Sequence, residues 1–79
     1  MRADNLEKMQ AIVKAVLELP EGSAVEAVRQ VATRRWDSLA QVSMIAAIES
    51  EFGIALSTDD YDRMSSYKAI VLLLEEKGF

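Results

Sequence analysis

The chain has 79 residues, a net charge of −4 and a hydrophobic content of 51%, which favours one small folded domain over residues 1–79. It contains no cysteine and no histidine, which excludes disulfides, thiolate nucleophiles, the usual zinc sites and a Ser-His-Asp triad. We therefore expect neither an enzyme with its own active site nor a metal site.

The first element in the chain is predicted to be an amphipathic helix. Asp4 and Glu7 have capping-box spacing at its start. Pro20 disfavours helical geometry in the residue before it, so we expect the helix to end near Leu19. Apolar residues at three- and four-residue steps would form its buried stripe, namely Leu6, Met9, Val13, Val16 and Leu17.

Residues 23–36 are predicted to be a long connection containing about two turns of helix. Ser23 and Glu26 again have capping-box spacing, but several β-branched residues weaken the helix propensity. We expect Trp36 to be a partly buried anchor for this loop. A basic cluster can hold a phosphate or a nucleic acid, but the acidic net charge argues against nucleic acid as a partner. The basic residues are Arg29, Arg34 and Arg35.

The second half of the chain predicts two more main helices and a short one. A central helix should run from about Ser38 to Phe52, with Gly53 as its C-terminal cap. Ser57 should start a short helix, and Ser65 or Ser66 should cap a last helix that ends at Gly78. The expected fold class is therefore all-α, a small four-helix bundle of three main helices and one short helix. Its predicted core includes Ile45, Ile48, Phe52, Leu56, Met64, Ile70 and Val71.

One short motif, Asp37-Ser38-Leu39, lies where the long connection meets the central helix. The spacing of Ser38 and Gln41 fits a capping box, in which the serine side chain satisfies a free backbone amide. The amides and the dipole at a helix N-terminus also favour an anion at this position.

The segment Trp36-Asp37-Ser38-Leu39, the helix after it and the run 49–54 resemble the acyl carrier protein family. The resemblance covers residues 38–77 well, whereas the first helix matches only in length and amphipathic pattern. It implies an acyl-carrier-protein-like bundle in which Ser38 carries 4′-phosphopantetheine donated from coenzyme A. It also implies that Asp37 contacts the phosphopantetheinyl transferase. The arm would present acyl or aminoacyl groups, as thioesters, to acyl-loading and acyl-transferring biosynthetic enzymes.

The same resemblance implies that the outer face of the central helix binds partner enzymes. We expect Leu39 to be the main contact, with Val42, Ala46 and Glu49 beside it, although Val42 and Ala46 also fit a core position. Positions that are often acidic in carriers of fatty-acid synthesis are here Ala40, Ser43 and Ser50. This difference indicates a specialised carrier for which charge is secondary to apolar contact.

A second hypothesis is a helical protein-interaction adaptor without a prosthetic group, in which Ser38 only caps the helix. Under either hypothesis we expect a monomer in the cytoplasm with no membrane partner, because no signal peptide and no spanning segment is visible. The sequence does not identify the acyl cargo or the pathway.

Overall fold

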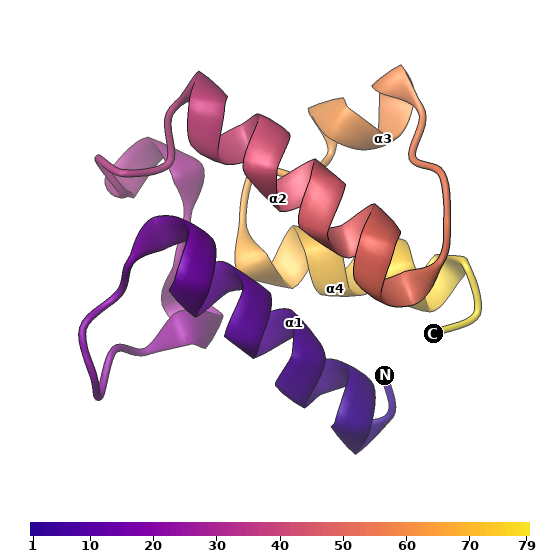
Figure 1. The fold of residues 1–79 in the computed structure, drawn as a ribbon, viewed down its shortest axis with the longest axis horizontal. Coiled ribbons are helices and arrows are strands. Elements are labelled where there is room, and N and C mark those ends of the chain that lie inside the picture. Colours follow the sequence, from indigo (N-terminus) through magenta and orange to yellow (C-terminus); the bar gives the residue numbers. More distant parts are fainter.

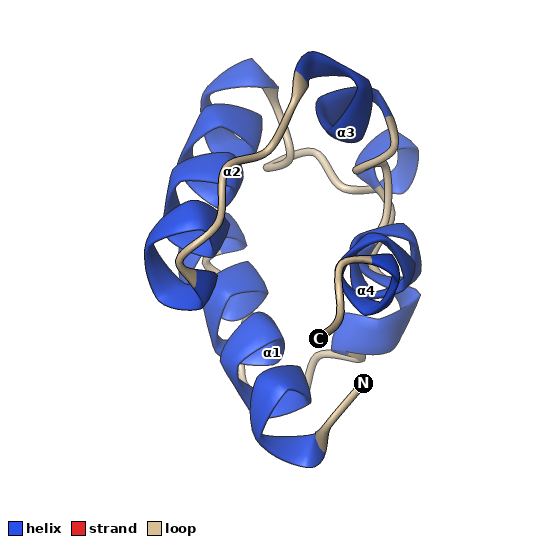
Figure 2. Cartoon of the chain, turned by 90° about the vertical axis from the view of Figure 1, so that its right-hand side faces the viewer, coloured by secondary structure: helices blue, strands red, loops and turns tan.

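Four α-helices and two short 3₁₀ turns make up the computed structural model, which describes residues 1–79 (Figure 1). The helices are α1 (Ala3–Leu17), α2 (Ser38–Phe52), α3 (Thr58–Asp62) and α4 (Tyr67–Glu76). The 3₁₀ turns are η1 (Val25–Ala27) and η2 (Gln30–Ala32). The prediction of an all-α bundle with three main helices and a short one is therefore confirmed, and Figure 2 shows these helices without any strand.

Helix α1 begins and ends earlier than the sequence predicts. Its N-cap is Arg2, without a side-chain cap, so the capping box of Asp4 and Glu7 is wrong. Asp4 lies inside the first turn, where its carboxylate pairs with the Arg2 guanidinium at 3.5 Å. The helix ends at Leu17 because Glu18 adopts a left-handed conformation with φ 51°. The backbone amides of Glu18 and Leu19 both donate to the Lys14 carbonyl.

The connection from α1 to α2 contains two 3₁₀ turns, in agreement with the short helical content predicted for it. The predicted capping box at Ser23 is wrong, because its hydroxyl donates to the Pro20 carbonyl at 2.7 Å. An isolated antiparallel bridge between Arg29 and Ser66 fastens the middle of the connection to the start of α4. Its two hydrogen bonds run from the Gln30 amide to the Ser65 carbonyl at 2.8 Å and from the Tyr67 amide to the Val28 carbonyl at 3.0 Å.

The core lies between α1, α2 and α4 and contains no buried polar or charged residue other than Tyr67, whose ring packs among the apolar side chains. Of the core residues predicted, Ile45, Phe52 and Val71 are only partly buried, because they pack against the outside of the buried cluster. The predictions for Ile48, Leu56, Met64 and Ile70 are confirmed. The buried set is Met9, Val13, Leu17, Val25, Trp36, Ala40, Met44, Ile48, Leu56, Met64, Tyr67, Ile70, Leu73 and Leu74.

Caps fix the ends of α2, α3 and α4. Gly53 has the left-handed conformation expected of a C-cap, with φ 65°. Ser57 and Asp60 form a reciprocal capping box at the start of α3, and Ser66 rather than Ser65 caps α4. The last helix was predicted to end at Gly78, but it ends at Glu76, and Gly78 follows the C-cap Lys77 with φ 99°. These caps set the lengths of both links that flank α3.

Ion pairs join α3 to the end of α4. The Ser57 amide and the Lys77 ammonium, whose nitrogen lies 3.1 Å from Asp60, together lower the pKa of the Asp60 carboxyl. The Arg63 guanidinium donates two hydrogen bonds to Glu76, at 2.8 and 2.7 Å, and lowers the pKa of that carboxyl. Both carboxylates are therefore held in their charged form where α3 meets α4.

Candidate functional site

The start of α2 is capped by Asp37. Its Oδ1 accepts a hydrogen bond from the Ala40 amide at 2.9 Å, and its backbone is extended. The predicted capping box of Ser38 and Gln41 is therefore wrong, because Ser38 is the first residue inside the helix. The loss of this capping role also removes the main observation in favour of an adaptor in which Ser38 only caps the helix.

Ser38 is exposed, and its hydroxyl takes part in no hydrogen bond within the chain. The backbone amides of Ser38 and Leu39 have no acceptor either, because the residues four positions before them lie outside the helix. Attachment of a group to this hydroxyl would therefore break no hydrogen bond within the chain. Free amides and the positive end of the helix dipole would favour a negative charge on that group.

A buried tryptophan fixes the loop directly in front of Ser38. Trp36 is 3% exposed, and its indole nitrogen donates to Gln41 Oε1 at 2.6 Å. Gln41 Nε2 in turn donates to the Tyr61 carbonyl in α3, at 3.4 Å. The glutamine that the sequence assigns to a cap thus joins the loop, α2 and α3. Sequence reasoning missed this contact, although an indole placed five residues before an amide side chain on a helix start is a usable signal.

The predicted partner face of α2 is exposed. Leu39 and Val42 are 75% and 64% exposed, and Ala46 lies on the same outer side. The core interpretation of Val42 and Ala46 is therefore wrong. Glu49 differs from them, because it is half-buried and its Oε2 accepts from the Leu56 amide at 2.8 Å. Its carboxylate holds the link between α2 and α3, which makes it less available to a partner than a free acid.

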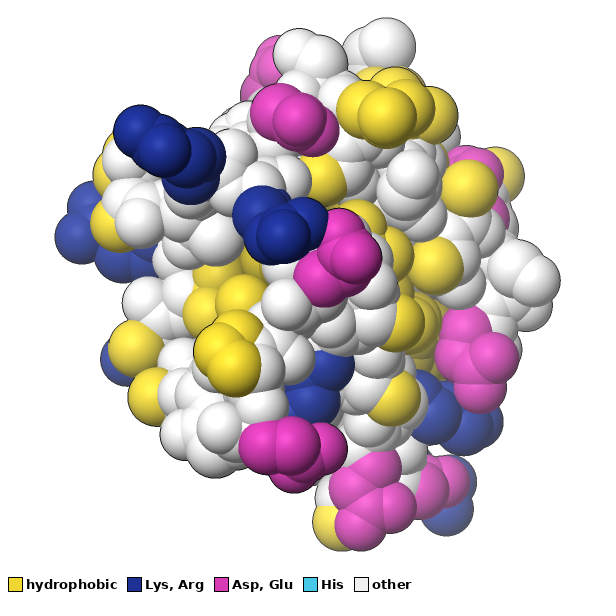
Figure 3. All heavy atoms as spheres, turned by 60° about the vertical axis from the view of Figure 1, so that its left-hand side comes forward, with side chains coloured by type: hydrophobic (Ala, Val, Ile, Leu, Met, Phe, Trp, Pro, Cys, Tyr) yellow, Lys and Arg dark blue, Asp and Glu magenta, His cyan; other side chains and the backbone are white.

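A small groove of about 220 Å³ lies beside the serine, between the end of α1 and the start of α2. Val16 of α1 and Glu18, the C-cap of that helix, line one side, and Leu39 and Ser43 line it from α2. Arg35 also lines it and forms an ion pair with Glu18, so one member of the predicted basic cluster is neutralised locally. Figure 3 views this side of the molecule and shows basic, acidic and hydrophobic side chains interleaved rather than one field of a single sign.

Two curated relatives match nearly the whole chain. Acyl carrier protein 1, chloroplastic, from Casuarina glauca is 33% identical over 75 residues, which cover 95% of this chain and 55% of the relative. Acyl carrier protein 2, chloroplastic, from Arabidopsis thaliana is 27% identical over 78 residues, which cover 99% of this chain and 57% of the relative. The chain is therefore similar to acyl carrier proteins over nearly its whole length, which supports membership of that family. It spans about half the length of the curated relatives it matches.

No family model matches the chain, and no solved structure matches it either. The predicted resemblance is confirmed by the two relatives, which extend it through α1, where the sequence analysis recognised only a pattern. The names of both relatives describe carriers, in agreement with the prediction made for this chain. None of its helices has the length and apolarity needed to span a bilayer.

Proposed function

We propose that this chain carries acyl or aminoacyl groups on a 4′-phosphopantetheine arm attached covalently to Ser38. A phosphopantetheinyl transferase would install the arm from coenzyme A. When bound, the arm supplies a terminal thiol for thioester formation, which the chain itself lacks because it has no cysteine. The observation that carries the proposal lies at the start of α2, where Asp37 caps the helix and Ser38 is exposed.

The local geometry suits a serine phosphodiester. The Ser38 hydroxyl is unpaired, and two free backbone amides lie at the same helix end. The hydrogen bonds of Trp36 and Gln41 keep the preceding loop in one conformation. A transferase would therefore meet a fixed serine rather than one in a mobile loop, which lowers the entropy lost on binding.

Asp37 would contribute a second group to transferase recognition. Only its Oδ1 is engaged in the cap, and its Oδ2 accepts no hydrogen bond within the chain. Since the residue is exposed, this oxygen is free to meet the transferase or the Mg²⁺ of the transfer reaction. Asp37 would then serve both the helix and the enzyme that modifies its neighbour.

Biosynthetic enzymes would dock on the apolar outer face of α2, formed by Leu39, Val42 and Ala46. A few residues near the centre of an interface usually supply most of its binding energy. The nearby acid, Glu49, is already bonded to the backbone of the α2–α3 link. These features favour a specialised carrier whose acyl-loading and acyl-transferring partners recognise shape before charge. The monomeric state and the cytoplasmic location stay predictions.

The test is a transferase assay read by intact mass. The apo protein is incubated with coenzyme A, Mg²⁺ and a broad-specificity phosphopantetheinyl transferase. The wild type should gain the mass of one phosphopantetheine, Ser38→Ala should gain none, and Ser43→Ala should behave as the wild type. Ser43 is a suitable control because it is an exposed serine on the same helix. If the wild type stays unmodified with several different transferases, the carrier proposal is wrong.

A further inference from the structure

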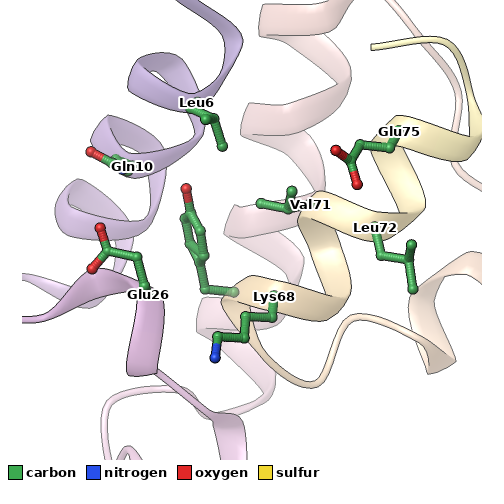
Figure 4. A pocket seen from close by; sticks show the side chains of 8 residues that line it. Leu6, Gln10, Glu26, Lys68, Val71, Leu72 and Glu75 are labelled. Carbon is green, nitrogen blue, oxygen red and sulfur yellow. The ribbon is translucent and has the colours of Figure 1, made fainter. Parts of the chain in front are cut away.

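A second groove lies on a different side of the bundle, between α1 and α4 (Figure 4). Its volume is about 310 Å³, at the lower end of the range for small-molecule sites. Leu6 and Gln10 line it from α1 and Glu26 from η1. The other side is lined by residues of α4, namely Tyr67, Lys68, Val71, Leu72 and Glu75. No residue of α2 takes part, so this groove is separate from the start of α2 and from the groove beside Ser38.

Tyr67 contributes an unexplained polar atom to this groove. The side chain lines the groove and is 4% exposed, and its hydroxyl is buried without any hydrogen-bond partner. It is the one buried side-chain polar atom in the chain that lacks a partner. An unpaired buried hydroxyl destabilises the fold, and phenylalanine would fill the same core space without that cost. The hydroxyl therefore points to a group that is supplied from outside.

The distribution of charge in the groove indicates what that group is. The charged side chains, Glu26, Lys68 and Glu75, belong to exposed residues at the mouth. The deeper lining is uncharged, with the half-buried Leu6 and Val71 as apolar walls. Burying an unpaired charge against such walls is costly, so a neutral ligand is favoured.

A second polar side chain without a partner restricts the chemical class of the ligand further. The half-buried Gln10 side chain makes no hydrogen bond within the chain, although it lines the same groove. Figure 4 shows Leu6 and Gln10 on one helix and Val71, Leu72 and Glu75 on the other, with Leu6 pointing toward α4. An amide ligand matches this pair of groups, because its carbonyl oxygen can accept a hydrogen bond from the Tyr67 hydroxyl. Its N–H group can donate to the carbonyl oxygen of the Gln10 side chain.

We infer that the groove between α1 and α4 binds a small neutral molecule with an apolar body and an amide, whose carbonyl oxygen accepts a hydrogen bond from Tyr67. The inference does not depend on the carrier proposal, since it concerns a different part of the surface and the unmodified chain.

N-phenylacetamide is a suitable probe, because it joins one amide to one apolar ring. It would be titrated into ¹⁵N-labelled unmodified protein, with ethylbenzene, which has no amide, as the comparison compound. We expect saturable shift changes at the amides of Leu6, Gln10, Lys68 and Leu72, with a dissociation constant of about 1 mM, as for ligands of this size. Ethylbenzene should bind several-fold more weakly at the same residues.

Tyr67→Phe is the decisive variant, because it removes the hydroxyl and keeps the ring. It should fold as the wild type does and bind the amide about three- to tenfold more weakly, the factor of one net hydrogen bond. Tyr61→Phe is the matched control, since Tyr61 does not line the groove, and its affinity should equal that of the wild type. Shifts centred on α2, or equal affinity in wild type and Tyr67→Phe, would overturn the inference and assign the hydroxyl to water alone.

Discussion

The carboxylate of Asp37 accepts a hydrogen bond from the backbone amide of Ala40 at 2.9 Å, and Ser38 between them takes no part in it. Two neighbouring residues that are both good helix caps thus have separate tasks. One ends the loop, and the other presents an unbonded hydroxyl to solvent. We therefore expect substitutions at Asp37 and at Ser38 to have different effects on stability.

The first prediction concerns the stability of variants at these two positions. Asp37→Ala should lower the free energy of unfolding by about 0.5–2 kcal/mol, the usual loss for a side-chain cap. Ser38→Ala should change it by less than about 0.5 kcal/mol, as for a surface position without a bond. Urea denaturation followed by circular dichroism measures both. Asp37→Asn keeps a capping oxygen and should retain most of the stability, and a larger loss in Ser38→Ala than in Asp37→Ala would contradict this assignment.

The second prediction concerns the hydrogen bond between the Trp36 indole and the Gln41 side chain, next to Ser38. Gln41→Ala removes the acceptor of the Trp36 indole, which is buried, and should cost about 1–3 kcal/mol for the unpaired donor that remains. Chemical denaturation followed by tryptophan fluorescence reports both the stability and the local environment. Gln10→Ala serves as the control, because the Gln10 side chain makes no hydrogen bond in the chain and its loss should cost much less. Equal effects of the two substitutions would show that the indole bond contributes little.

The third prediction concerns docking on α2. Leu39→Ala should weaken productive encounter with a cognate enzyme by about 1–2 kcal/mol, as for an interface anchor, while leaving stability nearly unchanged. Val31→Ala is the matched control, because Val31 is even more exposed, at 85%, but lies outside α2. Moderate salt should weaken the encounter less than the Leu39 substitution does. A partner that tolerates Leu39→Ala yet is released by salt would reverse this order.

The fourth prediction follows from the carboxylates that join α3 to α4. Their pKa values in the folded chain lie below the ordinary values of 3.8 for Asp60 and 4.5 for Glu76. A carboxyl whose pKa is lowered by folding contributes its full stabilisation at pH values above its ordinary pKa. This stabilisation is lost as the pH falls through the pKa that the group has in the folded chain. Stability should therefore be level near neutral pH and should decrease as the pH falls below about 4.5.

Acid titration of the folded protein by circular dichroism checks this dependence. Arg63→Gln removes the main cause of the Glu76 shift and should reduce the loss of stability between neutral and acid pH. Lys8→Gln, which removes an exposed lysine of α1 that forms none of the ion pairs, is the control. An unchanged acid profile in Arg63→Gln would mean that this ion pair does not contribute to the dependence.

Local patterns in the sequence predict the elements well, because the stop signals are local. Gly53, Ser57 and Ser66 act through their own backbone or their nearest amides, and each has the role or the conformation expected of it. The choice of cap at α2 is different, since Asp37 and Ser38 are both competent. Burial of Trp36, which draws Gln41 toward itself, decides between them, and that burial depends on the rest of the bundle.

The buried face of α2 shows a related difficulty. Apolar residues occur all round this helix, so the pattern does not define a stripe, and Met44 rather than its neighbour Ile45 is fully buried. The buried residues of α2 follow a four-residue step through Ala40, Met44 and Ile48. This step leaves Val42 exposed and Glu49 half-buried. The resemblance to acyl carrier proteins and the choice of Ser38 as the candidate serine came from the motif, whereas the groove between α1 and α4 required the packing of helices that are distant in sequence.

The bridge between Arg29 and Ser66 also has a consequence for the order of events during synthesis. It joins the loop before Ser38 to residues near the other end of the chain, and contacts between such distant residues form late because a long loop must close first. The ribosome releases the Ser38 region well before α4 emerges. We therefore expect the serine to reach its final setting only after α4 has emerged, so that a transferase selecting that setting would modify chains that contain a folded α4 and pass over shorter nascent ones.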